Sequence, residues 1–114
     1  MNFTVTENQT MIRQMCRDFA EKNIRPNVMV WDEAQTFPAD LFREMGKLGM
    51  MGILVPEEYG GSGLGYYEYV EAIVETAKVC GSIGLSLAAH NSLCTGHILY
   101  FGNHEQKSKW LPKL

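Results

Sequence analysis

Two histidines and a cysteine in one uncharged segment have a spacing that could serve a metal ion. His90, Cys94 and His97 stand at positions i, i+4 and i+7, which a helix would place on one face. Zinc accepts both imidazole and thiolate ligands. No carboxylate or second cysteine completes the set, and the surrounding residues are apolar. We therefore expect helix packing here and no metal site, and Cys94 has no basic partner nearby that would make it a nucleophile.

A glycine-rich stretch is the second candidate for chemistry. Residues 49–69, "GMMGILVPEEYGGSGLGYYEY", hold six glycines and Pro56. Glycine loops can cradle phosphate groups, but "GGSGLG" lacks the Lys and Ser/Thr of a Walker motif and does not follow a strand as G-x-G-x-x-G would. The favoured interpretation is a structural crossover in which glycines supply unusual backbone angles and Pro56 stiffens the entry.

An adjacent pair of carboxylates offers a possible acid–base couple. Glu57 and Glu58 directly follow Pro56, in what we expect to be a solvated turn. Burial would be needed to raise the pKa of either group toward neutrality. No other set of residues makes a complete catalytic constellation, so we expect no catalytic residue in this chain.

Composition excludes several classes of protein. The 114 residues carry a net charge of −3, and clustered cations of the kind that bind nucleic acid are missing. No run approaches the roughly 20 apolar residues of a membrane span, and the first ten residues show no secretion signal. The three cysteines form no short-spaced pair, so we expect reduced thiols. One globular domain is expected over residues 1–114.

Helical periodicity runs through the chain, and no segment alternates like a strand. The sequence "TENQ" predicts a capping box with Thr6 as N-cap, and Pro26 should end or kink the first helix. Further helices are expected over residues 26–34, 38–48, 66–80, 82–101 and from 103 onward. The inner face of the 66–80 helix is predicted to hold the apolar residues Tyr66, Val70, Ile73, Val74 and Ala77. The fold class is therefore all-α, a compact bundle of about five to six helices.

The segment 82–101 has no charged residue, so we expect a helix buried on most sides. Leu85, Ser86, Ala89 and Leu93 share one side of it, small in the middle and apolar at the ends. Such a stripe permits close helix packing, and it could also leave a slot for a slender apolar ligand. The pattern alone leaves both interpretations open.

Three segments together resemble the acyl-CoA dehydrogenases. They are "NIRPNVMVWDEAQTFP", "GMMGILVPEEYGGSGLG" and "FGNHEQKSKWLPKL", in the family's order and across essentially the whole chain. The segment "IGLSLAAHNSLC" is most similar to members that act on short or branched acyl groups, isovaleryl-CoA dehydrogenases in particular. The resemblance identifies residues 1–114 as the family's N-terminal helical domain, without its middle β-domain and C-terminal helical domain.

The resemblance implies an activity for the complete protein. Members use FAD to dehydrogenate acyl-CoA thioesters at the α and β carbons, pass electrons to an electron-transfer flavoprotein, and form homo-oligomers in the cytoplasm or, in eukaryotes, the mitochondrial matrix. The base and nearly all FAD contacts would lie outside this chain, so we expect the chain alone to be inactive and to bind no FAD. Carried over by position, Leu85, Ser86, Ala89 and Leu93, with the adjacent His90, would wall the acyl pocket. The alternative is a stand-alone helical interaction module that shares ancestry but not activity.

Overall fold

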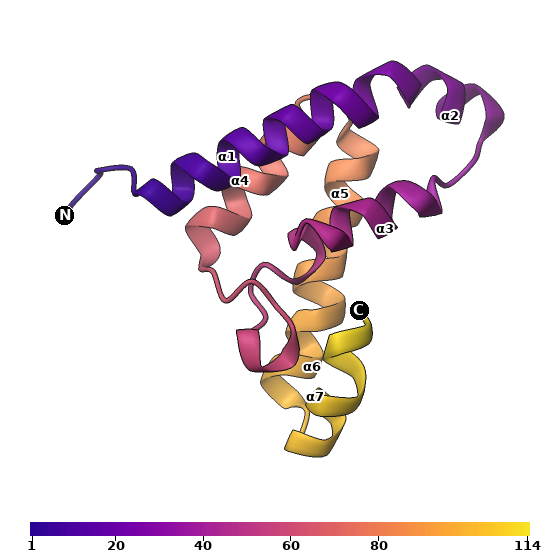
Figure 1. Cartoon of the computed structure of the whole chain (residues 1–114). Helices are drawn as coiled ribbons and strands as arrows, with labels where there is room; N and C mark the ends of the chain where they lie inside the picture. Colours follow the sequence, from indigo (N-terminus) through magenta and orange to yellow (C-terminus); the bar gives the residue numbers. More distant parts are fainter.

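A computed structural model describes residues 1–114 as an all-helical structure without strands, and the fold-class prediction is confirmed. The helices form five continuous runs, joined in the middle by an irregular crossover between α3 and α4 that contains two short 3-10 turns, Met50–Gly52 and Glu57–Tyr59. Figure 1 shows α1 lying along α4, while the run from α5 to α6 crosses them and ends against α7.

The first run begins at the predicted cap and bends instead of breaking at Pro26. Helix α1 (Glu7–Phe19) starts with the capping box: the Gln9 amide donates to Thr6 Oγ1 over 3.2 Å, and the Thr6 amide donates to Gln9 Oε1 over 2.9 Å. A π-helical turn (Ala20–Ile24) and a 3-10 turn (Arg25–Asn27) then lead into α2 (Val28–Ala34). Since proline has no amide proton, the hydrogen-bond ladder is reorganised here while the helix continues.

The remaining helices follow the predicted order with shifted ends. Helix α3 spans Ala39–Lys47 and α4 spans Tyr66–Ala77. The fourth run comprises α5 (Gly81–Ala89), a π-helical segment (His90–Thr95) and α6 (Gly96–Phe101). Helix α7 (His104–Trp110) opens with a second capping box between Asn103 and Gln106, as the sequence predicts, and a 3-10 turn (Leu111–Lys113) follows. None of these helices is long and apolar enough to span a lipid bilayer.

The inner face of α4 is mostly not the one that the sequence indicates, although Ile73 packs against the core as predicted. Val70 and Val74 are 52% and 40% exposed, whereas the buried residues of this helix are Tyr69, Ala72, Glu75 and Thr76. Arg17 on α1 neutralises the buried carboxylate of Glu75. Apolar periodicity misplaces this face because a charged residue occupies it.

The prediction that residues 82–101 are buried on most sides is wrong for this chain. One face is buried through Ile83, Gly84, Leu87, Asn91 and Thr95, but Leu85 is 72% exposed and Leu93 is 66% exposed. The molecule measures 42 × 36 × 20 Å, so its thin direction is about two helix diameters. In so thin a structure a helix is covered on one side only. The other, uncharged side of this helix packs against no other element of this chain.

Candidate functional site

The glycine-rich crossover satisfies its own backbone. The amides of residues 60–64 donate to the carbonyls of Glu57, Pro56, Gly52, Val55 and Ile53 respectively, over 2.9–3.2 Å. The amide of Gly65 donates to the carboxylate of Glu68 over 3.1 Å. A phosphate cradle needs several unpaired amides that converge on one point. This loop has none free in residues 60–65, so the structural crossover predicted from the sequence is confirmed.

Two glycines of the crossover are required by close approach. A Cβ on Gly61 would stand 2.0 Å from the carbonyl oxygen of Val55, closer than any side chain could tolerate. Gly49 has φ of +79°, and a Cβ there would stand 2.5 Å from Ser62 Oγ, which donates to the Gly49 carbonyl over 2.9 Å. The glycines therefore let the loop fold tightly on itself.

Asn91 joins this crossover to the long helix, the continuous run from α5 to α6. Its side chain is fully buried. The Ile53 amide donates to Asn91 Oδ1 over 3.0 Å, and Asn91 Nδ2 donates to the Met50 carbonyl over 2.9 Å and to the Leu87 carbonyl over 3.2 Å. One amide thus satisfies groups of both segments at once, and no buried side-chain polar atom in the protein lacks a partner.

An open groove of about 720 Å³ lies between α3, the crossover, the long helix and the C-terminal turn. Helix α3 contributes Phe42 and Gly46, and the crossover contributes Met51 and Gly52. The long helix contributes Ser86, His90 and Thr95, and the last turn contributes Leu111–Leu114. The lining mixes aliphatic, aromatic and neutral polar groups with the cations Arg43, Lys47 and Lys113. Its apolar part suits a ligand with an apolar body.

The five residues predicted as substrate-binding are divided between the groove and the surface beside it. Ser86 and His90 line the groove. Ala89 is half-buried, and Leu85 and Leu93 are exposed on the same helix. Ser86 Oγ donates to the carbonyl of Ser82 over 3.0 Å, so its hydroxyl is already satisfied and presents little polarity to a ligand.

His90 is neutralised by its surroundings. Burial lowers the pKa of the imidazole below its ordinary value of 6.5, and its hydrogen bond with the Leu114 carbonyl opposes this shift. The atoms joined are His90 Nε2 and the Leu114 oxygen, 3.2 Å apart. At neutral pH the groove therefore carries an uncharged imidazole on this wall.

The metal spacing of the sequence does not produce a metal cluster. His90 faces the groove, Cys94 is exposed, and the ring of His97 lies 6.0 Å from that of Phe101. No group of three or more His, Cys, Asp or Glu side chains is arranged to hold a metal ion. The i, i+4 argument assumes α-helical geometry, whereas residues 90–95 are π-helical.

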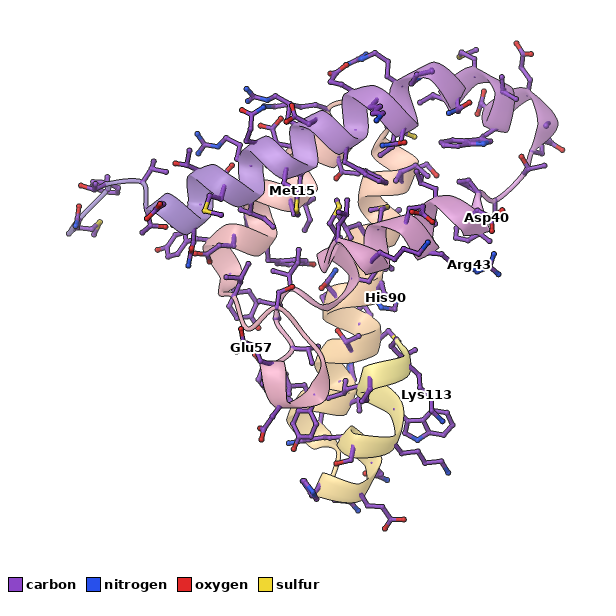
Figure 2. The ribbon with its side chains drawn as sticks, in the orientation of Figure 1. Met15, Asp40, Arg43, Glu57, His90 and Lys113 are labelled. Atoms are coloured by element: carbon purple, nitrogen blue, oxygen red, sulfur yellow. The ribbon has the colours of Figure 1, made fainter.

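Charged side chains stand at the groove, mostly with partners. Arg43 pairs with Asp40, and Lys47 pairs with Glu44 over 2.6 Å. In Figure 2, Arg43, His90 and Lys113 lie along one side of the molecule, while Glu57 lies on the other side. Glu57 and Glu58 are both exposed, so the acid–base couple weighed from the sequence lacks the burial that it needs.

Sequence reasoning missed Asn91. A carboxamide within an uncharged apolar segment has to find hydrogen-bond partners when it is buried, and this was the available signal. What could not be read from the sequence was the partner, because Ile53 lies 38 residues away in an irregular loop.

Comparison with known proteins gives a consistent result. The family profile described as "Acyl-CoA dehydrogenase, N-terminal domain" matches residues 6–114. An acyl-CoA dehydrogenase of Bacillus subtilis (strain 168) is 46% identical over 110 residues, which cover 96% of this chain and 29% of that protein. The mitochondrial isovaleryl-CoA dehydrogenase of Solanum tuberosum is 43% identical over 110 residues, which cover 95% of this chain and 27% of that protein.

A solved structure shows the same fold. The butyryl-CoA dehydrogenase of Megasphaera elsdenii superposes with a TM-score of 0.92 at 34% identity, over 98% of this chain and 30% of that one. The chain therefore spans somewhat less than a third of the length of these relatives.

Proposed function

Because the chain belongs to the acyl-CoA dehydrogenase family, as its N-terminal domain, we propose that the complete protein dehydrogenates short or branched acyl-CoA thioesters and that this domain supplies one wall of the acyl pocket. The observation that carries the proposal is the position of Ser86 and His90, which face a groove of about 720 Å³ from an uncharged helix. Relatives that act on isovaleryl-CoA and butyryl-CoA support the choice of a short or branched acyl group.

The wall would act by shape and by exclusion of water. Its polar members offer a ligand neither a charge nor a free hydroxyl: Ser86 is hydrogen-bonded within its own helix, and burial keeps His90 neutral. An apolar acyl chain placed there would exchange contact with water for contact with side chains. Leu85, Ala89 and Leu93 extend the uncharged surface beside the groove, and we propose that they complete the pocket wall where further parts of the protein cover them.

The one carboxylate that is buried in this domain is poorly suited to remove the α-proton. The buried carboxylate is Glu75, and Arg17 together with Lys78 lowers its pKa to about 2. A general base must take up a proton near the working pH, and a carboxylate so strongly paired does not. We propose that the base lies outside residues 1–114.

The residues of this domain also offer no site for FAD in the glycine-rich crossover, although the proposed reaction requires FAD as hydride acceptor. The glycine-rich crossover is the candidate in this chain for holding a pyrophosphate, and it does not fit, because its amides are bonded internally. We propose that FAD is bound by other parts of the complete protein, and that this domain alone is inactive.

The proposal extends to partners and place. We propose that the complete protein forms a homo-oligomer, passes electrons to an electron-transfer flavoprotein, and works in the cytoplasm, or in the mitochondrial matrix of a eukaryote. Mitochondrial relatives support the second compartment.

The test compares two serines of one helix in the complete enzyme. Ser86 and Ser92 each donate to the carbonyl four residues earlier, but only Ser86 lines the groove. Ser86→Leu should lower kcat/KM for the longer and the branched acyl-CoAs relative to the shortest, by about 10–200-fold for each methylene that no longer fits. Ala89→Phe should act in the same direction, and Leu93→Ala should admit longer chains. Ser92→Leu is the matched control and should leave the ranking unchanged.

An unchanged substrate ranking in Ser86→Leu, Ala89→Phe and Leu93→Ala, with a uniform loss of activity, would mean that these side chains only pack helix on helix.

A further inference from the structure

Asn91 connects two of the segments that line the groove, the crossover and its own helix. The two crossover groups that it bonds belong to Met50 and Ile53, and the two residues between them, Met51 and Gly52, line the groove. On its own helix, Asn91 adjoins His90, which also lines the groove. A single buried side chain therefore ties the two groove-lining segments together.

The local helix geometry accompanies the same contacts. Asn91 lies in the π-helical segment His90–Thr95, and the Thr95 hydroxyl donates to the Asn91 carbonyl over 2.9 Å. An extra residue in a helical turn is a costly local feature that often accompanies a functional site. Here it places the Asn91 carboxamide toward the crossover while His90 remains at the groove.

We propose that Asn91 is a positioning residue that sets the width of the groove and thereby the size of acyl group that the complete enzyme accepts; this rests on the proposed function. Asn91 does not line the groove itself. It acts through the position of Met51 and Gly52 relative to Ser86 and His90. Without the carboxamide, the Ile53 amide and the Met50 carbonyl lose their partner and the crossover segment has to move to find others.

The experiment uses Asn91→Leu in the complete enzyme, because leucine has the same number of side-chain heavy atoms, branched at Cγ, and cannot form the three hydrogen bonds. Thr76→Val is the matched control. Thr76 is also fully buried, but its hydroxyl donates within its own helix, to the Ala72 carbonyl over 2.8 Å, and it lies away from the groove. Both variants should lower the melting temperature.

Only Asn91→Leu should change the ratio of kcat/KM between a longer and a shorter acyl-CoA, by at least about tenfold. Hydrogen exchange at the Ile53 amide should also accelerate in Asn91→Leu and not in Thr76→Val. A loss of activity with the same substrate ranking and the same Ile53 exchange as wild type would overturn the proposal.

Gly52→Ala keeps the proposal testable if Asn91→Leu fails to fold. A Cβ at Gly52 would meet its nearest atom, Gly61 Cα, at 3.5 Å, which is an ordinary contact. The added methyl group should narrow the groove at the crossover and shift the preference of the enzyme toward shorter acyl groups. An unchanged ranking of kcat/KM among acyl-CoAs would overturn the role of this crossover segment. The outcomes also separate the two proposals. Ser86→Leu tests whether the groove binds acyl groups. If Ser86→Leu changes the substrate ranking while Asn91→Leu and Gly52→Ala leave it unchanged, the positioning role of Asn91 is refuted and acyl binding in the groove is not.

Discussion

The carboxylate of Glu75 on α4 is 4% exposed and accepts two hydrogen bonds from the guanidinium of Arg17 on α1, each 3.1 Å long. One turn away along both helices, Arg13 holds Glu71 in the same two-pronged arrangement. These paired contacts fix the register of α1 against α4. Because α4 also packs on α5, the position of the groove wall depends on this register.

Removing the guanidinium should therefore weaken the fold. We expect Arg17→Met to reduce the free energy of unfolding by about 1–3 kcal/mol, since it leaves a buried carboxylate with Lys78 as its remaining cation. Arg25→Met is the control: its partner Glu21 lies four residues away on the same exposed helix surface, so the cost should stay below about 0.5 kcal/mol. Urea unfolding of both variants measures the difference, and equal losses would contradict this account.

The same pair predicts a dependence of stability on pH. Arg17 first, and then Lys78, lower the pKa of Glu75 from 4.5 to about 2 in the folded protein, against the opposing effect of burial. A carboxyl group with a depressed pKa in the folded state stabilises the fold above its unfolded pKa, and this contribution is lost as the pH falls. The free energy of unfolding should thus decline between about pH 4.5 and pH 2. In Glu75→Gln the decline should be shallower; an identical profile would show that Glu75 is not responsible.

Two glycines should differ sharply when alanine replaces them. Gly61→Ala places a methyl group 2.0 Å from the Val55 carbonyl, so the crossover has to open, at a cost on the order of 3 kcal/mol or more. Gly81→Ala meets nothing within 4 Å and should change stability by less than about 1 kcal/mol, in the stabilising direction. Thermal unfolding of the two variants checks this; a tolerated Gly61→Ala would contradict the observed loop geometry.

The cysteines should react with thiol reagents in a fixed order. Burial raises the pKa of Cys16 to about 12, so it offers almost no thiolate near neutral pH. Cys94 is exposed and should be modified first, Cys80 is partly buried, and Cys16 should react only on unfolding. Peptide mapping after brief alkylation at pH 8 measures the order. Early modification of Cys16 in the folded chain would show that α1 does not pack as described.

The helices could largely be predicted from the sequence because their signals are local. The capping boxes at Thr6 and Asn103 are visible within four residues, and both form. The buried face of α4 could not be predicted, because it depends on Arg17, 58 residues away from Glu75, which makes a charged residue an interior one.

The helix that lines the groove could be predicted from the sequence, whereas the role of its residues in binding substrate stays a prediction. Ser86 and His90 lie on the helix that the sequence singled out, and the structure places both in the groove. The opposite wall comes from an irregular crossover that is held by Asn91, and no periodic pattern specifies where such a loop packs. Leu85 and Leu93 are exposed, and the pattern alone could not show this, because an uncharged segment by itself does not reveal which element covers it.

The central claim is that this domain walls the acyl pocket, and one distance tests it most directly. It is the separation between the end of a bound, unreactive short-chain acyl-CoA analogue and the side chains of Ser86 and His90, measured in a crystal structure of the complete protein. The account predicts van der Waals contact, about 4 Å between carbon atoms. An acyl group that lies against other elements, with Ser86 and His90 covered by protein and out of its reach, would contradict it.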